Sequence, residues 1–346
     1  MKGKRFAARA TALAAVVVLG LGVVGCGGDD DGGGEGEGFS IAFVSDTAGV
    51  NDRGFNEFTL AGVEQAGEEL GVETRTYVSV TEDDYVPNLT AAAEDGHDLV
   101  VAAGFLIAPS LVQVAAEFPD TSWAGVDHFY GGEGCEDAGT CELPNTLGLQ
   151  YPSEEPGYLA GIVAAITTKS NTVSSVGGIK IPSVDNWIAG FQQGVRDTNP
   201  EVETLNAYSQ DFTDQAKCKE IALDQISQGS DIVFQVAGQC GLGAIDAACE
   251  GGKFAIGVDA DQSAQGECVI FSALKPLQSS VFAVIESFTN GEFAGGTNQF
   301  FGIADLPDAA LLTEFTDDVP AEAQDAVDEA LEKLKSGEID PPATLE

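Results

Sequence analysis

From Phe39 onward the sequence alternates short apolar runs with longer segments in which apolar residues recur at helical spacing. Strands that alternate with helices in this way predict parallel sheets covered by helices on both faces. The expected strands are 39–45, 72–80, 98–103, 122–126, 146–150, 172–177, 202–208, 231–236, 254–258, 268–273 and 297–301. The expected helices are 55–70, 85–94, 109–118, 152–169, 186–197, 213–228, 241–250, 275–290 and 320–335. The alternation pauses at 131–145 and begins again at 171, so the sequence predicts an α/β fold with two doubly wound parallel-sheet lobes.

The first 25 residues have the features of a lipoprotein signal peptide. Four basic residues precede an uncharged apolar run, 11–24, which is shorter than the roughly 20 residues of a membrane span. The run ends in Val-Val-Gly-Cys, which resembles the lipobox whose cysteine, here Cys26, is diacylated. Residues 26–38, rich in Gly, Asp and Glu, predict a flexible tether. We therefore expect a lipid-anchored chain at the outer face of a bacterial cell membrane; the alternative is a signal peptide whose cysteine is incidental.

The composition excludes one class of partner. The chain carries 15 Lys and Arg against 56 Asp and Glu, which gives a formal net charge of −41. A nucleic-acid surface needs clustered basic side chains to contact phosphates, so we expect no nucleic-acid partner. The negative charge favours solubility and does not by itself identify a ligand.

Six cysteines remain once Cys26 is assigned to the lipid, and an even number in an exported chain predicts disulfides. Cys135 and Cys141 lie in one short Gly-rich loop, and we expect them to pair. The other four, Cys218, Cys240, Cys249 and Cys268, allow three connectivities. Zinc is the weaker alternative, because the chain has no Cys-x-x-Cys and only two His.

Residues 253–262 are typical of a buried strand that ends at a ligand crevice. Apolar residues lead to Val258, and carboxylates then stand at Asp259 and Asp261. In open α/β sheets, ligands bind outside the carboxyl ends of the strands. Asp127 ends an expected strand of the first lobe in the same way. We expect Asp127 and Asp259 to face a cleft between the lobes; the alternative is that each carboxylate caps its own loop.

Five blocks of sequence carry a resemblance to a known family. They are Asn-Asp-Arg-Gly-Phe-Asn at 51–56, Glu-Glu-Pro-Gly-Tyr-Leu-Ala-Gly at 154–161, Gly-Gly-Ile-Lys-Ile-Pro at 177–182 with Trp187, Ile-Gly-Val-Asp-Ala-Asp-Gln at 256–262, and Ser-Ala-Leu-Lys at 272–275. In this order they resemble the motifs of the basic membrane protein (BMP) family of ABC-transporter substrate-binding lipoproteins. Gly54 stands where the family usually has Ser, and Trp187 stands where Phe is frequent.

The resemblance implies a fold like the type I periplasmic binding proteins, with two lobes joined by a hinge. It places 39–148 and about 276–303 in the N-terminal lobe, and 149–275 and about 304–346 in the C-terminal lobe. It also implies a monomer that captures a nucleoside between its lobes, with a purine base expected, and delivers it to a membrane permease with its ATPase. Such a protein has no catalytic residue and needs no metal or cofactor.

The resemblance further implies roles for eight residues in nucleoside binding. Two aromatic rings would stack on the base, which is worth roughly 1–3 kcal/mol, and polar groups after the first strand would bond the edge of the base. Two carboxylates would accept hydrogen bonds from the ribose hydroxyls while a lysine balances their charge, and a glycine would let the backbone approach the ligand. These residues are Phe55 and Trp187, Asp46 and Asn56, Asp127, Asp259 and Lys275, and Gly238.

Other interpretations of these residues stay open. Phe55 is also typical of a core position at a helix start, Asn56 of a helix residue facing water, and Gly238 of an ordinary turn. Trp187 directly follows the polar residues Asp185 and Asn186, at the boundary between an expected loop and the expected helix 186–197, so we expect its ring to be exposed to the cleft.

Other functions also stay open. The same fold would hold a monosaccharide or another small polar ligand. A secreted hydrolase is a weaker alternative, because His128 lies beside Asp127 but no Gly-x-Ser-x-Gly elbow accompanies it. An extracellular adhesin is the remaining alternative.

Overall fold

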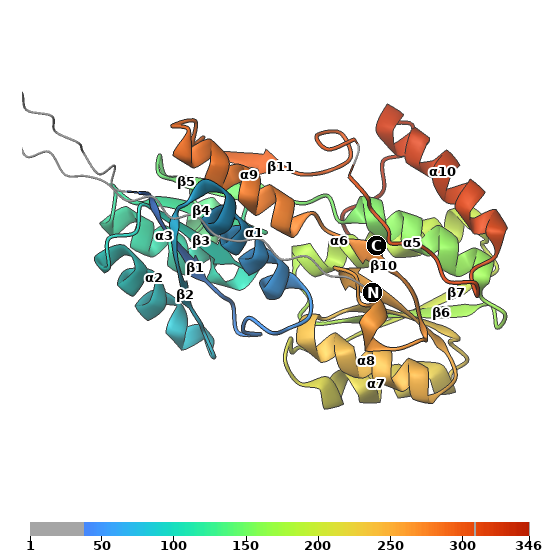
Figure 1. Ribbon diagram of the computed structural model, residues 1–346. Coiled ribbons are helices and arrows are strands. Elements are labelled where there is room, and N and C mark those ends of the chain that lie inside the picture. Colours follow the sequence, from blue (N-terminus) through green and yellow to red (C-terminus); the bar gives the residue numbers. More distant parts are fainter. Residues whose placement is uncertain (1–37, 308, 346) are drawn as a thin grey trace, which may run out of the picture. The chain divides into compact units, whose positions relative to one another are not determined.

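The computed structural model describes residues 38–307 and 309–345; the predicted signal peptide, most of the tether and Cys26 lie outside this part. The first sheet has six parallel strands in the order β11-β5-β4-β3-β1-β2 (Figure 1). Its strands are β1 (Ser40–Val44), β2 (Glu73–Tyr77), β3 (Leu99–Ala103), β4 (Ser122–Val126), β5 (Thr146–Gln150) and β11 (Thr297–Phe300). The second has five parallel strands in the order β10-β9-β8-β6-β7. They are β6 (Thr172–Gly177), β7 (Glu203–Tyr208), β8 (Ile232–Val236), β9 (Phe254–Asp259) and β10 (Val269–Leu274). The predicted pair of parallel-sheet α/β lobes is confirmed.

Helices cover both faces of each sheet, as the continuous apolar runs of the strands require. In the first lobe, α1 (Phe55–Leu70) and α9 (Leu277–Thr289) share a core with Ile41 and Phe43 of β1. On the other face, α2 (Tyr85–Glu94) and α3 (Ala108–Glu117) share a core with Ala42 and Val44. In the second lobe, α5 (Glu154–Thr167), α6 (Pro182–Thr198) and α10 (Ala321–Ser336) cover one face. Helices α7 (Gln215–Ser227) and α8 (Gly238–Glu250) cover the other (Figure 1).

Glycines allow α5 and α6 to pack in close contact. A Cβ at Gly161 would overlap the carbonyl oxygen of Phe191, and one at Gly194 would overlap that of Tyr158. The two backbones therefore approach too closely for any side chain between them. Helix α6 also begins at Pro182, four residues before the expected start, because proline is favoured in the first turn of a helix.

Replacing Gly194 with Ala should destabilise the protein by roughly 2 kcal/mol, because the new methyl group can be accommodated only if the two helix backbones separate. The free energy of unfolding in urea measures this effect. Gly67→Ala is the matched control, since Gly67 lies inside α1 and its Cβ would meet a methyl group of Thr74 at 3.1 Å. That variant should be neutral or slightly more stable, because alanine favours helix. If both variants were as stable as wild type, this result would contradict the claim that no side chain fits between the backbones of α5 and α6 at Gly194.

The chain passes between the lobes in three segments that meet at one place. The segments follow β5, β10 and β11, and they line a small cavity together through residues that include Tyr151, Lys275 and Phe301. The rings of Tyr151 and Phe301 stack with their centres 5.6 Å apart. The Glu155 carboxylate accepts a hydrogen bond of 2.8 Å from the Ile303 amide. These contacts join the three crossing segments at the place where the sequence predicts a hinge between the lobes.

Three disulfides settle the pairings that the sequence left open. Cys135 pairs with Cys141 across the short helix α4 (Cys135–Ala138), as expected. In the second lobe, Cys218 pairs with Cys240, and Cys249 pairs with Cys268. Among residues 38–307 and 309–345, no helix has the length and apolar character needed to cross a membrane.

Candidate functional site

A cavity lies between the lobes, where the carboxyl ends of strands from both sheets face each other. Its empty volume is about 560 Å³, which includes the part that is open to solvent. All eight predicted ligand-binding residues line it: Asp46, Phe55, Asn56, Asp127, Trp187, Gly238, Asp259 and Lys275. The structure thus brings together residues that span 230 positions of the sequence.

Lys275 is the central charge of the cavity. Its Nζ donates hydrogen bonds of 2.9 and 3.1 Å to the two carboxylate oxygens of Asp127 in the first lobe. It also lies 3.9 Å from Oδ1 of Asp259 in the second lobe. The side chain is only 3% exposed, and the rings of Phe55 and Tyr151 lie 5.2 Å from Nζ. A buried ammonium group is stable only when paired, so the two carboxylates hold this lysine between the lobes.

The Asp259 carboxylate has an unfilled capacity for hydrogen bonds. Its Oδ1 is buried and accepts no hydrogen bond from any described residue. Burial raises the pKa of Asp259 to about 6, with the charge of Lys275 opposing the rise and that of Asp127 adding to it. A buried acceptor without a donor costs roughly 1–3 kcal/mol, so a hydroxyl group brought by a ligand would be bound favourably here.

Asp127 and Asp259 share an uncommon backbone conformation. Their φ angles are 63° and 66°, in the left-handed region that residues other than glycine seldom occupy. Asp and Asn tolerate this region better than other residues do. The turn points both strand-end carboxylates toward Lys275, and each lobe contributes one of them.

A second polar group lies after β1. The Asn56 amide accepts a hydrogen bond from the Asp46 backbone at 3.1 Å and donates to the carboxylates of Asp46 and Asp52 at 3.2 and 3.1 Å. Burial raises the pKa of Asp46 to about 6, although hydrogen bonds from Ala48 and Asn56 oppose the rise. Oδ2 of Asp46 faces Gly104, where a Cβ would stand only 2.6 Å away. Asn56 therefore positions Asp46, and its predicted contact with a ligand stays a prediction.

Aromatic side chains form much of the remaining wall. Phe55 begins α1, and Phe105 and Phe212 line the same cavity from loops after β3 and β7. Trp187 differs from the expectation of an exposed loop residue. It lies in the second turn of α6, it is only 2% exposed, and it packs edge-on against Phe234 with ring centres 6.2 Å apart.

His128 has no access to the cavity. It is fully buried and bonded to Tyr130 Oη at 2.6 Å and to the Gly104 carbonyl at 2.7 Å. Burial lowers the pKa of His128 to about 4, so the ring is neutral at physiological pH. Its contacts are those of a structural residue that supports Gly104.

One hydrogen bond joins the lobes away from the hinge. The Gln262 amide donates to the carbonyl of Arg53 at 3.2 Å, and its Oε1 accepts from Gln235 at 2.6 Å and from the Val258 backbone at 3.1 Å. The contacts of Gln262 connect the wall of the cavity in the second lobe to the loop before α1.

Several residues that line the cavity have no role predicted from the sequence, including Asp52, Phe105, Ile181, Ser183 and Phe212. Asp52 lies in a recognised motif and accepts hydrogen bonds from the amides of Gly54, Asn56 and Glu57 at the start of α1. Phe105 and Phe212 follow expected strands. Their position after a strand was the available signal, since that edge of each sheet faces the cavity.

The raised pKa values of two cavity carboxylates, Asp46 and Asp259, predict how these groups contribute to the pH dependence of stability. Asp46 and Asp259 have an ordinary pKa of 3.8 when unfolded and about 6 when folded, so the folded chain binds more protons between these values. The ligand-free protein should therefore gain about 1 kcal/mol per group when the pH falls from 7.5 to 5. Urea unfolding at both pH values measures the gain, and the Asp259→Asn variant should show a smaller one. An equal gain in that variant would contradict the assignment to Asp259.

The described residues contain no group of three or more His, Cys, Asp or Glu placed to hold a metal ion. Among the charged residues that line the cavity, four are aspartates and one is a lysine: Asp46, Asp52, Asp127, Asp259 and Lys275. This excess of negative charge favours neutral hydroxylated ligands and opposes phosphates.

Comparison with known proteins gives consistent matches over almost the whole described chain. A family model described as "ABC transporter substrate-binding protein PnrA-like" matches residues 39–343. The chain is 30% identical over 326 residues to the CD4+ T-cell-stimulating antigen of Listeria monocytogenes, covering 88% of each chain. It is 28% identical over 325 residues to the ABC transporter nucleoside-binding protein BmpA of Lactococcus lactis, covering 87% of this chain and 88% of the relative.

A solved ABC transporter solute-binding protein from Aeropyrum pernix K1 has a similar fold. The TM-score is 0.79 at 23% identity, covering 89% of this chain and 94% of the other. At this identity the likeness concerns the fold alone.

Proposed function

The chain belongs to the Bmp family of PnrA-like ABC transporter substrate-binding proteins, and from this premise we propose that it captures a nucleoside between its lobes for import. The protein acts as a binding component and performs no reaction on its ligand. It delivers the nucleoside as a monomer to a membrane permease that is driven by an ATPase. The base is a purine in this proposal, since the cavity offers aromatic walls together with polar groups after β1.

The observation that carries the proposal is the polar group formed by Asp127, Lys275 and Asp259. The two carboxylates come from different lobes, and Asp259 Oδ1 is buried without a donor. A ribose ring presents two neighbouring hydroxyls that donate to such acceptors, and hydrogen bonds to charged groups contribute roughly 1.5–3 kcal/mol each. A ligand that bonds to Asp127 and Asp259 together would also hold the lobes closed.

The aromatic walls support a flat base as the other half of the ligand. Phe55 comes from the first lobe, and Trp187 and Phe212 come from the second. Stacking on a nucleobase is worth roughly 1–3 kcal/mol per ring. The printed name of the Lactococcus lactis relative, a nucleoside-binding protein, points to the same ligand class.

A free monosaccharide is the second candidate, because the same carboxylates and lysine would bond its hydroxyls without a base. Mass spectrometry of small molecules released from the freshly purified and denatured protein separates the two candidates. We expect a nucleoside at near-stoichiometric amount. A sugar without a nucleobase would overturn the nucleoside assignment and leave the membership of the family unchanged.

The proposal also places the protein on the outer face of the membrane through a lipid on Cys26, which lies outside the described residues. We expect the full-length protein to partition into the detergent phase of a Triton X-114 extraction. The Cys26→Ala variant should move to the aqueous phase, because it lacks the acyl chains that anchor it. Detergent partitioning that is unchanged in the variant would show that another feature holds the protein at the membrane.

A further inference from the structure

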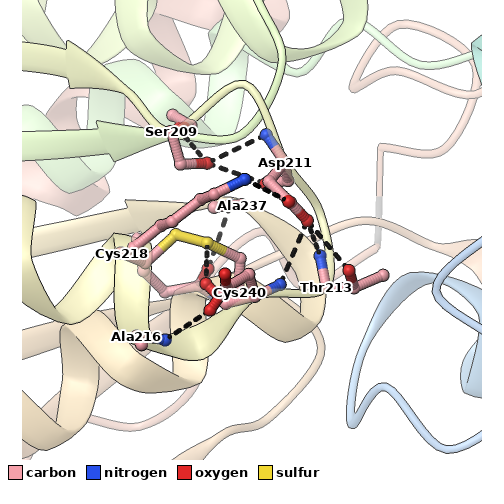
Figure 2. Close-up of a disulfide and its surroundings, with 11 residues drawn as sticks. Ser209, Asp211, Thr213, Ala216, Cys218, Ala237 and Cys240 are labelled. Carbon is pink, nitrogen blue, oxygen red and sulfur yellow. Dashed lines mark hydrogen bonds and ion pairs between the residues drawn. A yellow bond between two sulfur atoms is a disulfide. The ribbon is translucent and has the colours of Figure 1, made fainter.

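The Cys218–Cys240 disulfide lies next to the wall of the cavity. Helix α8 begins at Gly238, which lines the cavity with a φ of 55°, and Cys240 is two residues further on. Cys218 lies in the first turn of α7, and both cysteines are 0% exposed. Figure 2 shows the bridge beside the loop that carries Ser209, Asp211 and Thr213. The bridge therefore joins the start of α8 to the helix that this loop leads into.

Phe212 in this loop is held from two sides. Its carbonyl accepts a hydrogen bond of 2.9 Å from the amide of Cys240. Its ring lies so close to Gly178 that a Cβ at Gly178 would overlap two ring atoms. Phe212 thus occupies a fixed place in the cavity wall between the end of β6 and the start of α8.

The loop and the first turn of α7 form one unit around the Asp211 carboxylate. Asp211 accepts hydrogen bonds of 2.8 and 3.0 Å from the amides of Thr213 and Asp214, and one of 2.7 Å from Nζ of Lys217 (Figure 2). The beginning of the loop is bonded to β6 through the amide of Ser209. Its far end is tied to α8 by the bond between Cys240 and Phe212 and, covalently, by the disulfide.

We propose that the Cys218–Cys240 disulfide is a positioning element of the ligand site, because it holds residues 209–214, and with them Phe212, against the cavity. Ligand affinity then depends on the bridge although neither cysteine lines the cavity. This inference rests on the proposed function for the identity of the ligand, and it adds a determinant of affinity that the family motifs do not contain.

The chain offers a matched control for this bridge. The Cys249–Cys268 disulfide joins the opposite end of α8 to the start of β10. The two bridges close segments with sequence separations of 22 and 19 residues, so their loss should lower stability by similar amounts. Only one of them lies beside the cavity. If removing a bridge weakened ligand binding only through a general loss of stability, removing either bridge would weaken it.

The test compares Cys218→Ala/Cys240→Ala with Cys249→Ala/Cys268→Ala by calorimetry with adenosine, guanosine and inosine. The first variant should bind the preferred nucleoside about ten-fold more weakly, which is a usual size for coupling between sites. The control variant should bind the nucleoside as tightly as wild type does, although its Tm should fall by about as much as that of the first variant. Phe212→Ala in the wild type and in the first variant completes a double-mutant cycle, and its effects should be non-additive because the bridge acts through Phe212.

Hydrogen exchange tests the same inference without any ligand. The amide of residue 240, which donates to Phe212, should exchange faster in the first variant and unchanged in the control variant. Unchanged exchange and unchanged affinity in the first variant would overturn the inference. Faster exchange in the first variant, combined with a wild-type protein that binds no nucleoside, would instead support the positioning role and refute the nucleoside assignment.

Discussion

Replacing Asp259 with Asn is expected to weaken nucleoside binding by about 100-fold. The asparagine keeps the size of the side chain and tolerates the left-handed backbone at this position. The substitution exchanges a charged carboxylate, which would accept hydrogen bonds from the ligand hydroxyls, for a neutral amide that has a single acceptor oxygen. Losing two charge-assisted hydrogen bonds accounts for a difference of about 3 kcal/mol. Isothermal titration of both proteins with the same nucleoside measures the change.

Asp261→Asn is the control for this experiment. Asp261 stands two residues later in the same strand-end segment, but its side chain is exposed and accepts a hydrogen bond only from the Ser263 amide at 2.9 Å. We expect an affinity within about two-fold of wild type, as for a surface substitution away from the site. Equal loss of affinity in the two variants would contradict the assignment of the ligand to Asp259.

Replacing Lys275 with Met should destabilise the protein by about 3 to 5 kcal/mol and abolish measurable binding. Methionine has a similar length and fills the space between the aromatic rings, so the change removes mainly the charge. Asp127 and Asp259 then lie buried without their cation, and breaking one partner of a buried ion pair costs this amount. Urea unfolding and calorimetry measure the two effects.

The pH dependence identifies the cause of the Lys275→Met effect. In the wild type, the lysine charge opposes the rise in the pKa of Asp259, so its removal raises that pKa further. A carboxyl group whose pKa is raised in the folded protein lowers the free energy of unfolding at pH values above that pKa. This destabilisation disappears as the pH falls and the group is protonated. The loss of stability should therefore shrink from pH 7.5 to pH 5. Lys253 is half-buried and directly precedes β9, and the control Lys253→Met should cost little stability at either pH. A loss of stability in Lys275→Met that does not depend on pH would indicate a packing defect instead.

The arrangement of strands and helices was predictable because it depends on local periodicity. The segment 253–262 shows this: a short apolar run followed by Asp259 indicated a strand and the edge at which it ends. The rule that ligands bind at the carboxyl ends of parallel strands then placed Asp127 near Asp259. The structure brings both residues together with Lys275, whose place in the site only the family resemblance implied. The resemblance to the family supplied their roles, which stay predictions.

Other features were not predictable because they depend on contacts between distant parts of the chain. Four cysteines allow three pairings, and only the neighbourhood of α7 with α8 selects Cys218–Cys240. The glycines of α5 do not reveal whether their partner is a sheet or, as found, the backbone of α6. Phe212 follows a strand in the sequence, but its place in the cavity wall depends on Gly178 and Cys240.

The central claim is that the cavity between the lobes binds a nucleoside through both its sugar and its base. Isothermal titration of the protein, freed of co-purified ligand, with adenosine, guanosine, inosine, ribose and adenosine monophosphate tests it most directly. We expect saturable binding of at least one nucleoside. Ribose should bind much more weakly because it leaves the aromatic walls unused, and the monophosphate should bind much more weakly because four aspartates and one lysine line the cavity. Tight binding of ribose with no response to any nucleoside would contradict it.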